Sequence, residues 1–268
     1  MSVSLNKFIS STGRCSRREA DQLIASGRVT LNGKVAILGN RVEPGDKVLI
    51  DQQPLKSKPP TLYIAFNKPV GIVCTTDQKE KKNIIRFINH PQRLFPIGRL
   101  DKPSQGLIFL TNDGDIVNKI LRAGNQHEKE YQVTVNQPIT DLFIQKMQSG
   151  IPILGTVTEP CTVTQLGENT FTITLTQGLN RQIRRMCEYL GYEVTRLKRM
   201  RIMHVRLGKL PPGKWRELTR KELKTLRHLI GDSSKTEEAS RLPKRPAKKS
   251  SSLGHSKKGR NRNSKKKR

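Results

Sequence analysis

Hydrophobic and polar positions between residues 62 and 230 alternate between short strand patterns and helical patterns. Apolar or period-two runs predict strands in the segments LYIAFNK, GLIFLT, YQVTV, CTVTQL, TFTITLT and MHVRL. The helical stretches between them do not follow the regular strand and helix alternation of a parallel sheet, and no repeat of fixed period is visible in the sequence. The pattern therefore predicts an α+β domain, to which we assign residues 62–232.

A smaller α+β unit is predicted for residues 1–51. Ser16 and Glu19 have the spacing of a capping box, in which each side chain bonds the other residue's backbone amide, so a helix should begin there. Gly27 is suited to the left-handed residue that ends a helix, and VTLNGKVA predicts a hairpin around Asn32-Gly33. The apolar stripe of this helix consists of Ala20, Leu23 and Ile24.

Two further segments lack the apolar residues that a folded core needs. Residues 52–61 contain three prolines and no apolar periodicity, which predicts a linker. Residues 233–268 are rich in Ser, Lys, Arg and Pro, and they cannot bury enough apolar surface to offset the entropy of the chain. We therefore expect a disordered, Lys/Arg-rich tail after the second domain.

The charge of the chain indicates a polyanionic partner. Lys and Arg total 51 against 22 Asp and Glu, for a formal net charge of +29. The tail over 233–268 holds 14 of these cations and 2 of the acidic residues, so residues 1–232 remain strongly positive without it. A basic folded body predicts nucleic-acid binding as part of the function, with ribosomal RNA favoured.

Several classes of function are disfavoured by what the sequence lacks. Neither a GxxxxGK[ST] phosphate-binding loop nor a GxGxxG motif is present, which argues against nucleotide-driven chemistry and dinucleotide cofactors. The four cysteines have no CxxC spacing and form no ligand pattern with the histidines, so we expect reduced thiols, no metal and no cofactor. No apolar run approaches the length of a membrane span, and MSVSLNKFIS lacks a signal-peptide core, which predicts a soluble, cytoplasmic protein.

The segment GRLDKPSQG, residues 98–106, is the best candidate for a chemical site. Its single carboxylate, Asp101, lies between Arg99 and Lys102, and residues two apart in an extended segment point the same way. The flanking glycines permit close approach of a ligand, and the buried run GLIFLT that follows would anchor the loop on the core. From the residues alone, the favoured explanation of the segment is a Gly/Pro turn with a capping aspartate and solvated cations.

The N-terminal segment LNKFISSTGRCSRREADQLIASGRVTLNG resembles an S4 domain, a small RNA-binding module. Cations cluster on or beside its first helices, an arrangement that is also typical of a solvated helix face. The resemblance implies that they contact an RNA backbone. The candidate RNA-binding residues are Lys7, Arg14, Arg17, Arg18 and Arg28.

Four motifs of the larger domain resemble, in their order, those of the pseudouridine synthases of the RsuA/RluB/E/F type: NKPVG, GRLDKPSQGLIFLTNDG, EKEYQVTV and GLNRQIRRMCEYLGYEV. The surrounding sequence is most similar to the F-type branch, which modifies 23S rRNA of the large ribosomal subunit. The resemblance implies an S4 domain followed by a catalytic domain with a mixed, mostly antiparallel sheet and flanking helices. It also implies cofactor-free isomerisation of uridine to pseudouridine.

The resemblance assigns the central role to Asp101, as a nucleophile on the sugar or as a base at the ribose 2′ position. Burial beside an apolar strand would raise the pKa of such a carboxyl group unless an opposite charge offsets the desolvation. The resemblance supplies Arg184 as that charge, although an ion pair between Arg184 and Glu188 on one helix is the alternative. It places Tyr131 against the target base, where a core aromatic is the alternative.

The remaining assignments concern substrate binding. Arg99 is suited to fill the space left by a flipped base, or else it holds phosphate. Lys68 in NKPVG is expected to be a structural or phosphate contact, and Leu207 to pack on the uracil. The expected partner is 23S rRNA or a pre-ribosomal particle, bound by a monomer. Two alternatives stay open: a synthase for 16S rRNA or a tRNA, and a non-catalytic RNA-binding or ribosome-assembly factor.

Overall fold

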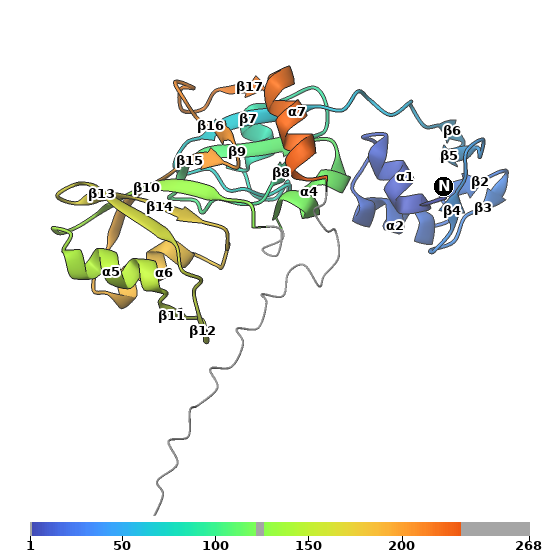
Figure 1. Cartoon of the computed structure of the whole chain (residues 1–268). Helices are drawn as coiled ribbons and strands as arrows, with labels where there is room; N and C mark the ends of the chain where they lie inside the picture. The colour runs from blue at the N-terminus through green and yellow to red at the C-terminus, as the bar shows by residue number, and fades with distance from the viewer. Residues whose placement is uncertain (1, 122–125, 232–268) are drawn as a thin grey trace, which may run out of the picture.

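The computed structural model describes residues 2–121 and 126–231, in which two folded units are joined by an extended connection (Figure 1). The tail predicted over 233–268 lies outside the described residues. No helix in the described ranges is long and apolar enough to cross a membrane.

The N-terminal unit has the helices and the hairpin that the sequence predicts. Ser16 caps α2 through a complete capping box with Glu19, and Gly27 follows the helix with a φ of +71°. The residues Asn32-Gly33 form the turn between β2 and β3. The elements are β1 (Val3–Ser4), α1 (Leu5–Ser11), α2 (Arg17–Ala25), β2 (Val29–Leu31), β3 (Lys34–Val35), β4 (Arg41–Val42), β5 (Val48–Ile50) and β6 (Gln53–Pro54).

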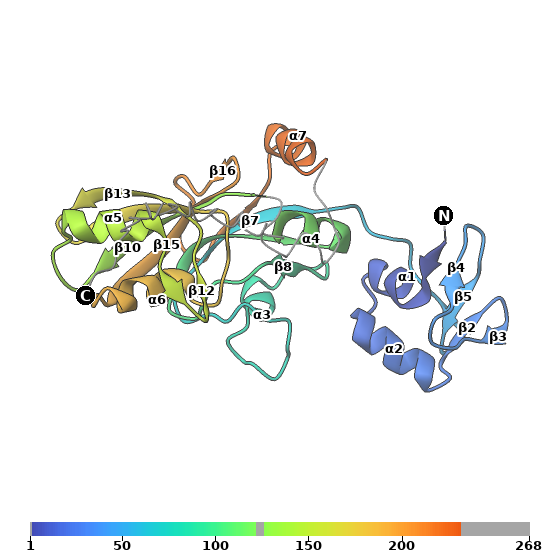
Figure 2. The same cartoon turned by 60° about the horizontal axis from the view of Figure 1, so that its bottom comes forward.

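The predicted linker over 52–61 begins too early. Gln53–Pro54 form β6, which pairs with β5, and Leu55 packs against the core of the N-terminal unit. A proline is tolerated at the first or last position of an edge strand, because it has no N–H to leave unpaired there. The extended connection therefore runs from this point to the start of the larger sheet (Figure 2).

The larger unit is built on a nine-stranded sheet whose main path runs β13-β14-β10-β15-β9-β7-β17, with β16 beside β15 and β8 beside β9. Every pair is antiparallel except β15 with β9, which confirms the mixed, mostly antiparallel sheet. The strands are β7 (Tyr63–Lys68), β8 (Phe95–Ile97), β9 (Gln105–Thr111), β10 (Lys129–Val135), β13 (Thr162–Gly167), β14 (Thr170–Leu175), β15 (Val194–Ile202), β16 (Val205–Arg206) and β17 (Trp215–Glu217).

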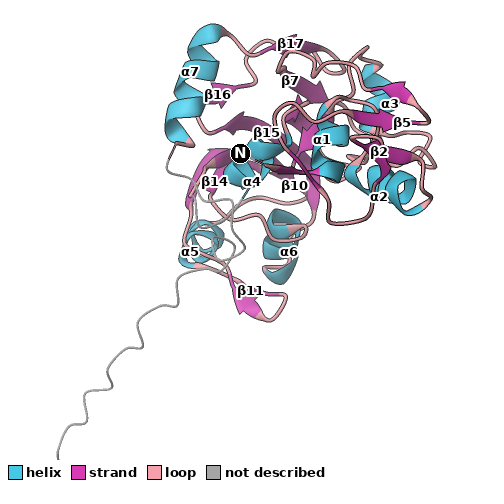
Figure 3. Ribbon diagram, turned by 90° about the vertical axis from the view of Figure 1, so that its right-hand side faces the viewer, coloured by secondary structure: helices cyan, strands magenta, loops and turns pink. Residues whose placement is uncertain are grey.

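Helices cover the two halves of this sheet on different faces (Figures 1 and 3). One core packs α5 and α6 against β10, β14 and β15, while α4 and α7 pack against β7 and β9. Alternate residues of β7 and β9 point to the opposite face, where they pack against α3. The remaining elements are α3 (Ile84–Ile88), α4 (Gly114–Leu121), α5 (Asp141–Ser149), α6 (Gln182–Tyr189) and α7 (Arg220–Leu229), and a hairpin of β11 (Pro152–Ile153) and β12 (Thr156–Val157).

The two halves of the sheet meet at the short parallel pairing of β9 with β15. Gly106 lies opposite Arg199 in this pairing, with a φ of +109°. A Cβ atom on Gly106 would lie 2.4 Å from the backbone oxygen of Arg199, which is far inside van der Waals contact. The glycine is thus needed for the strands to approach, directly beside the loop that carries Asp101.

Contacts of Glu222 at the start of α7 stabilise the folded state in a pH-dependent way. Glu222 forms a capping box with Thr219 and accepts two hydrogen bonds of 2.7 Å from the Arg216 guanidinium. The hydrogen bonds from Arg216 contribute most, and with those from Thr219 they lower the pKa of Glu222 to about 2 from an ordinary value of 4.5.

Glu222→Gln is expected to lower the free energy of unfolding by about 1 kcal/mol at neutral pH, because glutamine keeps the capping box but loses the charge that pairs with Arg216. Because the folded pKa of Glu222 lies below its unfolded value, its stabilisation is complete above pH 4.5 and is lost as the pH falls towards 2. Urea unfolding of both proteins should therefore show the difference shrinking below pH 4.5. A difference that stays constant would show that ionisation of Glu222 does not contribute.

Candidate active site

A cavity of about 690 Å³ opens where β9 meets β15, within the size range of ligand sites. Its walls come from residues 73–75, the loop 98–104, and residues 177–184 at the start of α6, with further side chains from β10 and β15. Among the described residues that line it, Asp101 has the one carboxylate. Six cationic side chains line the same cavity: Arg99, Lys102, Lys129, Arg181, Arg184 and Arg199.

A buried lysine stabilises the loop that carries Asp101 through hydrogen bonds to its backbone. The Lys68 ammonium donates to the backbone oxygens of Ser104 at 2.7 Å, Pro69 at 3.0 Å and Asp101 at 3.2 Å. Lys68 is fully buried, and burial lowers the pKa of its ammonium. Of the two roles predicted for Lys68, the structure favours the structural one over a phosphate contact, because these contacts and a longer one to Lys102 all go to backbone oxygens and the side chain is buried.

The Asp101 carboxylate is partly exposed and faces a different arginine from the one predicted. Within residues 2–121 and 126–231 the one cation in ion-pair range is Arg181, whose Nη1 lies 4.0 Å from Asp101 Oδ2. Arg184 lines the same cavity but forms no ion pair with Asp101 or Glu188 in the described part of the chain, so both predicted pairings need correction. Instead Arg184 Nη1 donates to the backbone oxygen of Val194 at 2.9 Å, which turns the guanidinium towards the start of β15.

Arg184 nevertheless has unused hydrogen-bonding capacity next to the carboxylate. Its Nε and Nη2 atoms are buried and have no hydrogen-bond partner among the described residues. Burial and the neighbouring Arg181 charge lower the pKa of the Arg184 guanidinium, while Asp101 raises it. The desolvation of these two donors is uncompensated by the described residues, which makes Arg184 a strained part of the cavity wall.

Arg181 occupies a conformation that arginine rarely adopts. It is the N-cap residue of α6 and has φ +50° and ψ +33°, in the left-handed region that favours glycine. Strained residues of this kind cluster at functional sites, where the surrounding structure holds them. Arg181 was not predicted as a site residue, because the NRQIRR motif contains three arginines and periodicity does not distinguish which one faces Asp101.

Arg181→Gly is expected to separate stability from function. Glycine adopts a positive φ without strain, so the melting temperature should not fall, whereas turnover should fall about tenfold through loss of the cation beside Asp101. Thermal unfolding and single-turnover kinetics measure the two effects. Arg181→Lys, which keeps the charge, is the matched control and should retain most of the activity; equal activity of the glycine and lysine variants would contradict a role for the charge.

Tyr131 and two buried cations form the wall on β10 and β15. The Cζ atom of Arg199 lies 5.9 Å from the centroid of the Tyr131 ring, and the tyrosine both lines the cavity and packs on the core. Arg199 is 5% exposed, and its Nε donates to the backbone oxygen of Leu107 at 2.6 Å. Its Nη2 has no partner in the described chain. The two interpretations of Tyr131, core aromatic and site residue, are thus compatible.

Lys129 lies two residues before Tyr131 on the same face of β10, so strand periodicity could have identified it. Its ammonium donates to the backbone oxygens of His127 at 2.8 Å and Thr176 at 3.2 Å. Burial, with the nearby Arg199 charge, lowers the pKa of Lys129 to about 8. The lysine therefore ties β10 to the segment that leads to α6.

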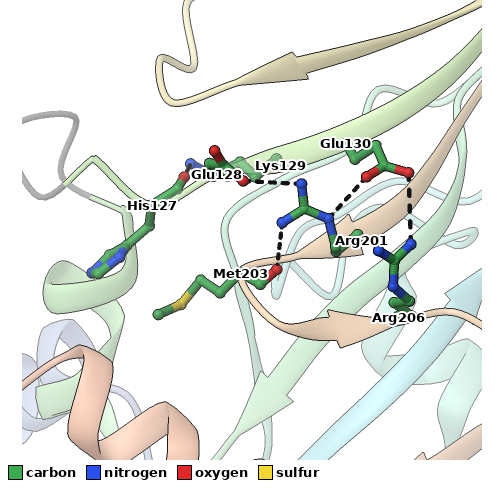
Figure 4. A network of polar contacts seen from close by, with 7 residues as sticks. All are labelled: His127, Glu128, Lys129, Glu130, Arg201, Met203 and Arg206. Atoms are coloured by element: carbon green, nitrogen blue, oxygen red, sulfur yellow. Dashed lines mark hydrogen bonds and ion pairs between the residues drawn. The ribbon is translucent and has the colours of Figure 1, made fainter. Parts of the chain in front are cut away.

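The opposite face of β10 carries an ion-pair network (Figure 4). Arg201 donates to Glu130 at 2.9 Å, to Glu128 at 3.0 Å and to the backbone oxygen of Met203 at 2.7 Å. Arg206 approaches the second oxygen of Glu130 at 3.9 Å. These contacts hold β10 against β15 and so maintain the position of the cavity wall.

Arg99 is exposed at the rim of the cavity and has no ion pair within the described residues, consistent with a group that meets the substrate. Leu207, by contrast, is 3% exposed and belongs to the core around α7. The β15–β16 hairpin turns it away from the cavity, so its assignment to the uracil is wrong. Apolar wall positions near the carboxylate are supplied by Leu175 and Leu197 instead.

The predicted cations of the N-terminal unit divide into two groups. Arg14, Arg17 and Arg18 are exposed at the start of α2 and are available to a backbone phosphate. Lys7 forms a 2.6 Å ion pair with Asp115 on α4, and Arg28 donates to Asp51 at 2.7 Å. The positive charges of Lys7 and Arg28 are thus already paired with carboxylates of the same chain.

The described residues contain no group of three or more His, Cys, Asp or Glu side chains that could hold a metal ion. The chemistry that this cavity can support from its own residues is that of one carboxylate, a phenol, and guanidinium and ammonium donors. Such a set of groups suits a polyanionic substrate in which Asp101 attacks one carbon atom or removes one proton.

Comparisons with known proteins agree with both units. Residues 62–189 match the family model described as RNA pseudouridylate synthase, and residues 3–56 match the S4 domain. The dual-specificity RNA pseudouridine synthase RluF of Escherichia coli K12 is 60% identical over 235 residues, covering 87% of this chain and 81% of the relative. This agrees with the predicted F-type resemblance.

More distant relatives have the same organisation. The ribosomal large subunit pseudouridine synthase B of Bacillus subtilis is 36% identical over 84% of this chain and 96% of its own length. A crystal structure of a pseudouridylate synthase superimposes with a TM-score of 0.62 at 30% identity, covering 84% of this chain and 99% of that one. The chain therefore belongs to the RNA pseudouridine synthase family, as an isomerase that carries an N-terminal S4 domain.

Proposed function

We propose that this enzyme isomerises uridine to pseudouridine in 23S rRNA of the large ribosomal subunit, with Asp101 as the catalytic residue. The observation that carries the assignment to Asp101 is its position as the one carboxylate among the described residues that line a cavity with six cationic side chains. The target follows the names of the relatives, one of which is a synthase of the ribosomal large subunit and another of which is called dual-specificity. A tRNA, one of the alternatives left open by the sequence, is a second candidate substrate.

Isomerisation requires the bond from uracil N1 to the sugar to break and a bond from C5 to form. Asp101 serves either as the nucleophile on the sugar or as the base that removes the ribose 2′ proton, and both roles need an ionised carboxylate. The Arg181 guanidinium lies 4.0 Å from the Asp101 carboxylate, and Arg184 lines the same cavity. These arginines also offer donors to the uracil carbonyls or to a phosphate while the base is detached.

The uridine must leave its stack to reach this cavity, at a cost of a few kcal/mol. Tyr131, with Arg199 beside its ring, presents an aromatic surface on which the uracil stacks. Arg99 at the rim is placed to fill the gap in the RNA, since its planar guanidinium both stacks and donates hydrogen bonds. Arg14, Arg17 and Arg18 supply affinity through phosphates, while the cavity selects the base.

The test is to incubate the purified full chain with separate transcripts of 23S rRNA, 16S rRNA and tRNA, without added nucleotide, and to map pseudouridine by reverse-transcription stops after carbodiimide treatment. Modification of 23S rRNA at a defined uridine is the expected result. Modification of 16S rRNA alone would overturn the proposed target. Binding without modification of any of the three RNAs would favour the assembly-factor alternative.

A deletion strain tests whether the reaction occurs in cells. Its ribosomes should lack the same pseudouridine, and the wild-type chain should restore it. We expect the enzyme to act there as a cytoplasmic monomer on 23S rRNA or a pre-ribosomal particle. The Asp101→Asn chain is the control that separates the reaction from RNA binding.

A further inference from the structure

The hairpin of β11 and β12 has an unusual turn. Leu154 and Gly155 connect the two strands, with φ values of +51° and +72°. Positive φ at both central residues defines the type I′ turn, for which Asn-Gly is the favoured sequence. The hairpin of β2 and β3 uses that sequence, and its Asn32 and Gly33 have φ values of +52° and +81°. The hairpin of β5 and β6 turns through Asp51 and Gln52, with φ values of +50° and +62°.

Leucine therefore occupies a backbone position that disfavours it, and packing does not explain its presence. The side chain of Leu154 is 53% exposed. Of the eight described residues other than glycine with positive φ, three are Asn or Asp, which tolerate this region, and Leu154 is the one with a branched aliphatic side chain. An exposed leucine held in a strained turn indicates a function outside the folding of the hairpin.

The exposed side of the hairpin is apolar and uncharged. Pro152, Leu154 and Val157 are exposed, whereas Ile151 and Ile153 point into the core beside α5 and α6. No charged residue occurs in the nine positions 150–158, in a chain that is 27% charged. The hairpin thus presents a small apolar tip.

This tip extends from the part of the molecule that surrounds the candidate active site. Figures 1 and 3 show the hairpin beyond α6, on the side of the sheet that α5 and α6 cover. β11 packs against α6, and the residues at the start of α6 line the cavity. After β12, the backbone N–H of Glu159 donates at 3.1 Å to Gln177, which also lines the cavity.

We propose that the β11–β12 hairpin is an additional RNA contact in which Leu154 inserts as an apolar wedge against the stacked bases beside the flipped nucleotide. The apolar area fits a wedge better than a protein interface, because a stable protein interface uses roughly 20–30 residues on each side, whereas a wedge needs one or two side chains. The cationic cavity is lined by the start of α6, so RNA bound there lies on the same side of the sheet as the hairpin. The inference rests on RNA binding by this synthase and does not depend on which RNA is the natural target.

Leu154→Asn tests the wedge, since it restores the Asn-Gly turn and removes the apolar side chain. We expect an unchanged or higher melting temperature together with a roughly tenfold decrease in single-turnover rate on a folded 23S rRNA transcript. Leu166→Asn, at a leucine of similar exposure on β13, is the matched control and should leave the rate unchanged. A wild-type rate for Leu154→Asn would overturn the proposal.

A contact measurement separates the wedge from other causes of slow turnover. A photoreactive leucine analogue at position 154 should crosslink to the protein-free transcript, and the analogue at position 166 should not. Crosslinking to ribosomal proteins in intact large subunits, without crosslinking to the free RNA, would show that the tip docks on protein and would overturn the proposal. If the wild-type chain binds the transcript without modifying it, the proposed target is wrong, while crosslinking at position 154 still decides the wedge.

Discussion

Replacing Asp101 with asparagine is expected to abolish isomerisation while RNA binding is retained. The substitution keeps the size and the loop contacts of the side chain, because Lys68 and Ser104 bond the backbone oxygen of Asp101 and not its carboxylate. It removes the charge that either proposed chemical role requires. We expect turnover to fall by about 10³-fold or more, as when a catalytic nucleophile or base is neutralised.

Binding is expected to stay the same or to strengthen slightly, since one negative charge leaves a cavity lined by six cations. Pseudouridine mapping measures turnover, and filter binding at two salt concentrations measures affinity. Asp141→Asn, at an exposed carboxylate in the first turn of α5, is the matched control and should be fully active. Turnover within tenfold of wild type for Asp101→Asn would contradict the assignment.

Gly106→Ala is expected to have the largest effect on the fold and to inactivate the enzyme as well. The added Cβ would lie 2.4 Å from the backbone oxygen of Arg199, where β9 pairs with β15. The strands must separate to accept it, and alanine is strained at a φ of +109°. We expect the free energy of unfolding to fall by about 2–4 kcal/mol, and turnover to fall with it because the Asp101 loop and Arg199 lose their relative positions.

Gly33→Ala separates the two causes of this effect. Gly33 also has a positive φ, of +81°, but no atom lies within 4 Å of the position that its Cβ would take. This variant therefore carries the backbone strain without the clash, and it should lose about 1 kcal/mol and keep its activity. Equal losses in the two variants, measured by urea unfolding, would show that the close approach of β9 to β15 is unimportant.

Local signals in the sequence predict much of the fold. The capping box of Ser16 and Glu19 and the Asn32-Gly33 turn depend on a few adjacent residues, and both are present. The strand β15 (Val194–Ile202) was missed because it reads VTRLKRMRI, whose many cations do not form an apolar run. Its arginines are held by partners from other strands, such as Glu130 on β10, and such contacts are invisible to a local pattern.

The candidate site was predictable at the level of segments but not of individual contacts. The motif order brings Asp101, Tyr131 and Arg184 to one cavity, as expected. Which arginine approaches Asp101 depends on the left-handed turn at Arg181, and sequence periodicity gives no sign of it. The role of Lys68 stayed open and Leu207 was misassigned, because the local sequence does not show whether a lysine or a leucine faces a ligand or the core.

The most direct test of the account is a structure of the Asp101→Asn enzyme bound to an RNA fragment that the wild-type enzyme modifies. The account predicts the target uridine out of its stack and inside the cavity, with its sugar against residue 101 and its base on Tyr131. A stacked uridine with its sugar far from residue 101, or a base bound outside this cavity, would contradict it.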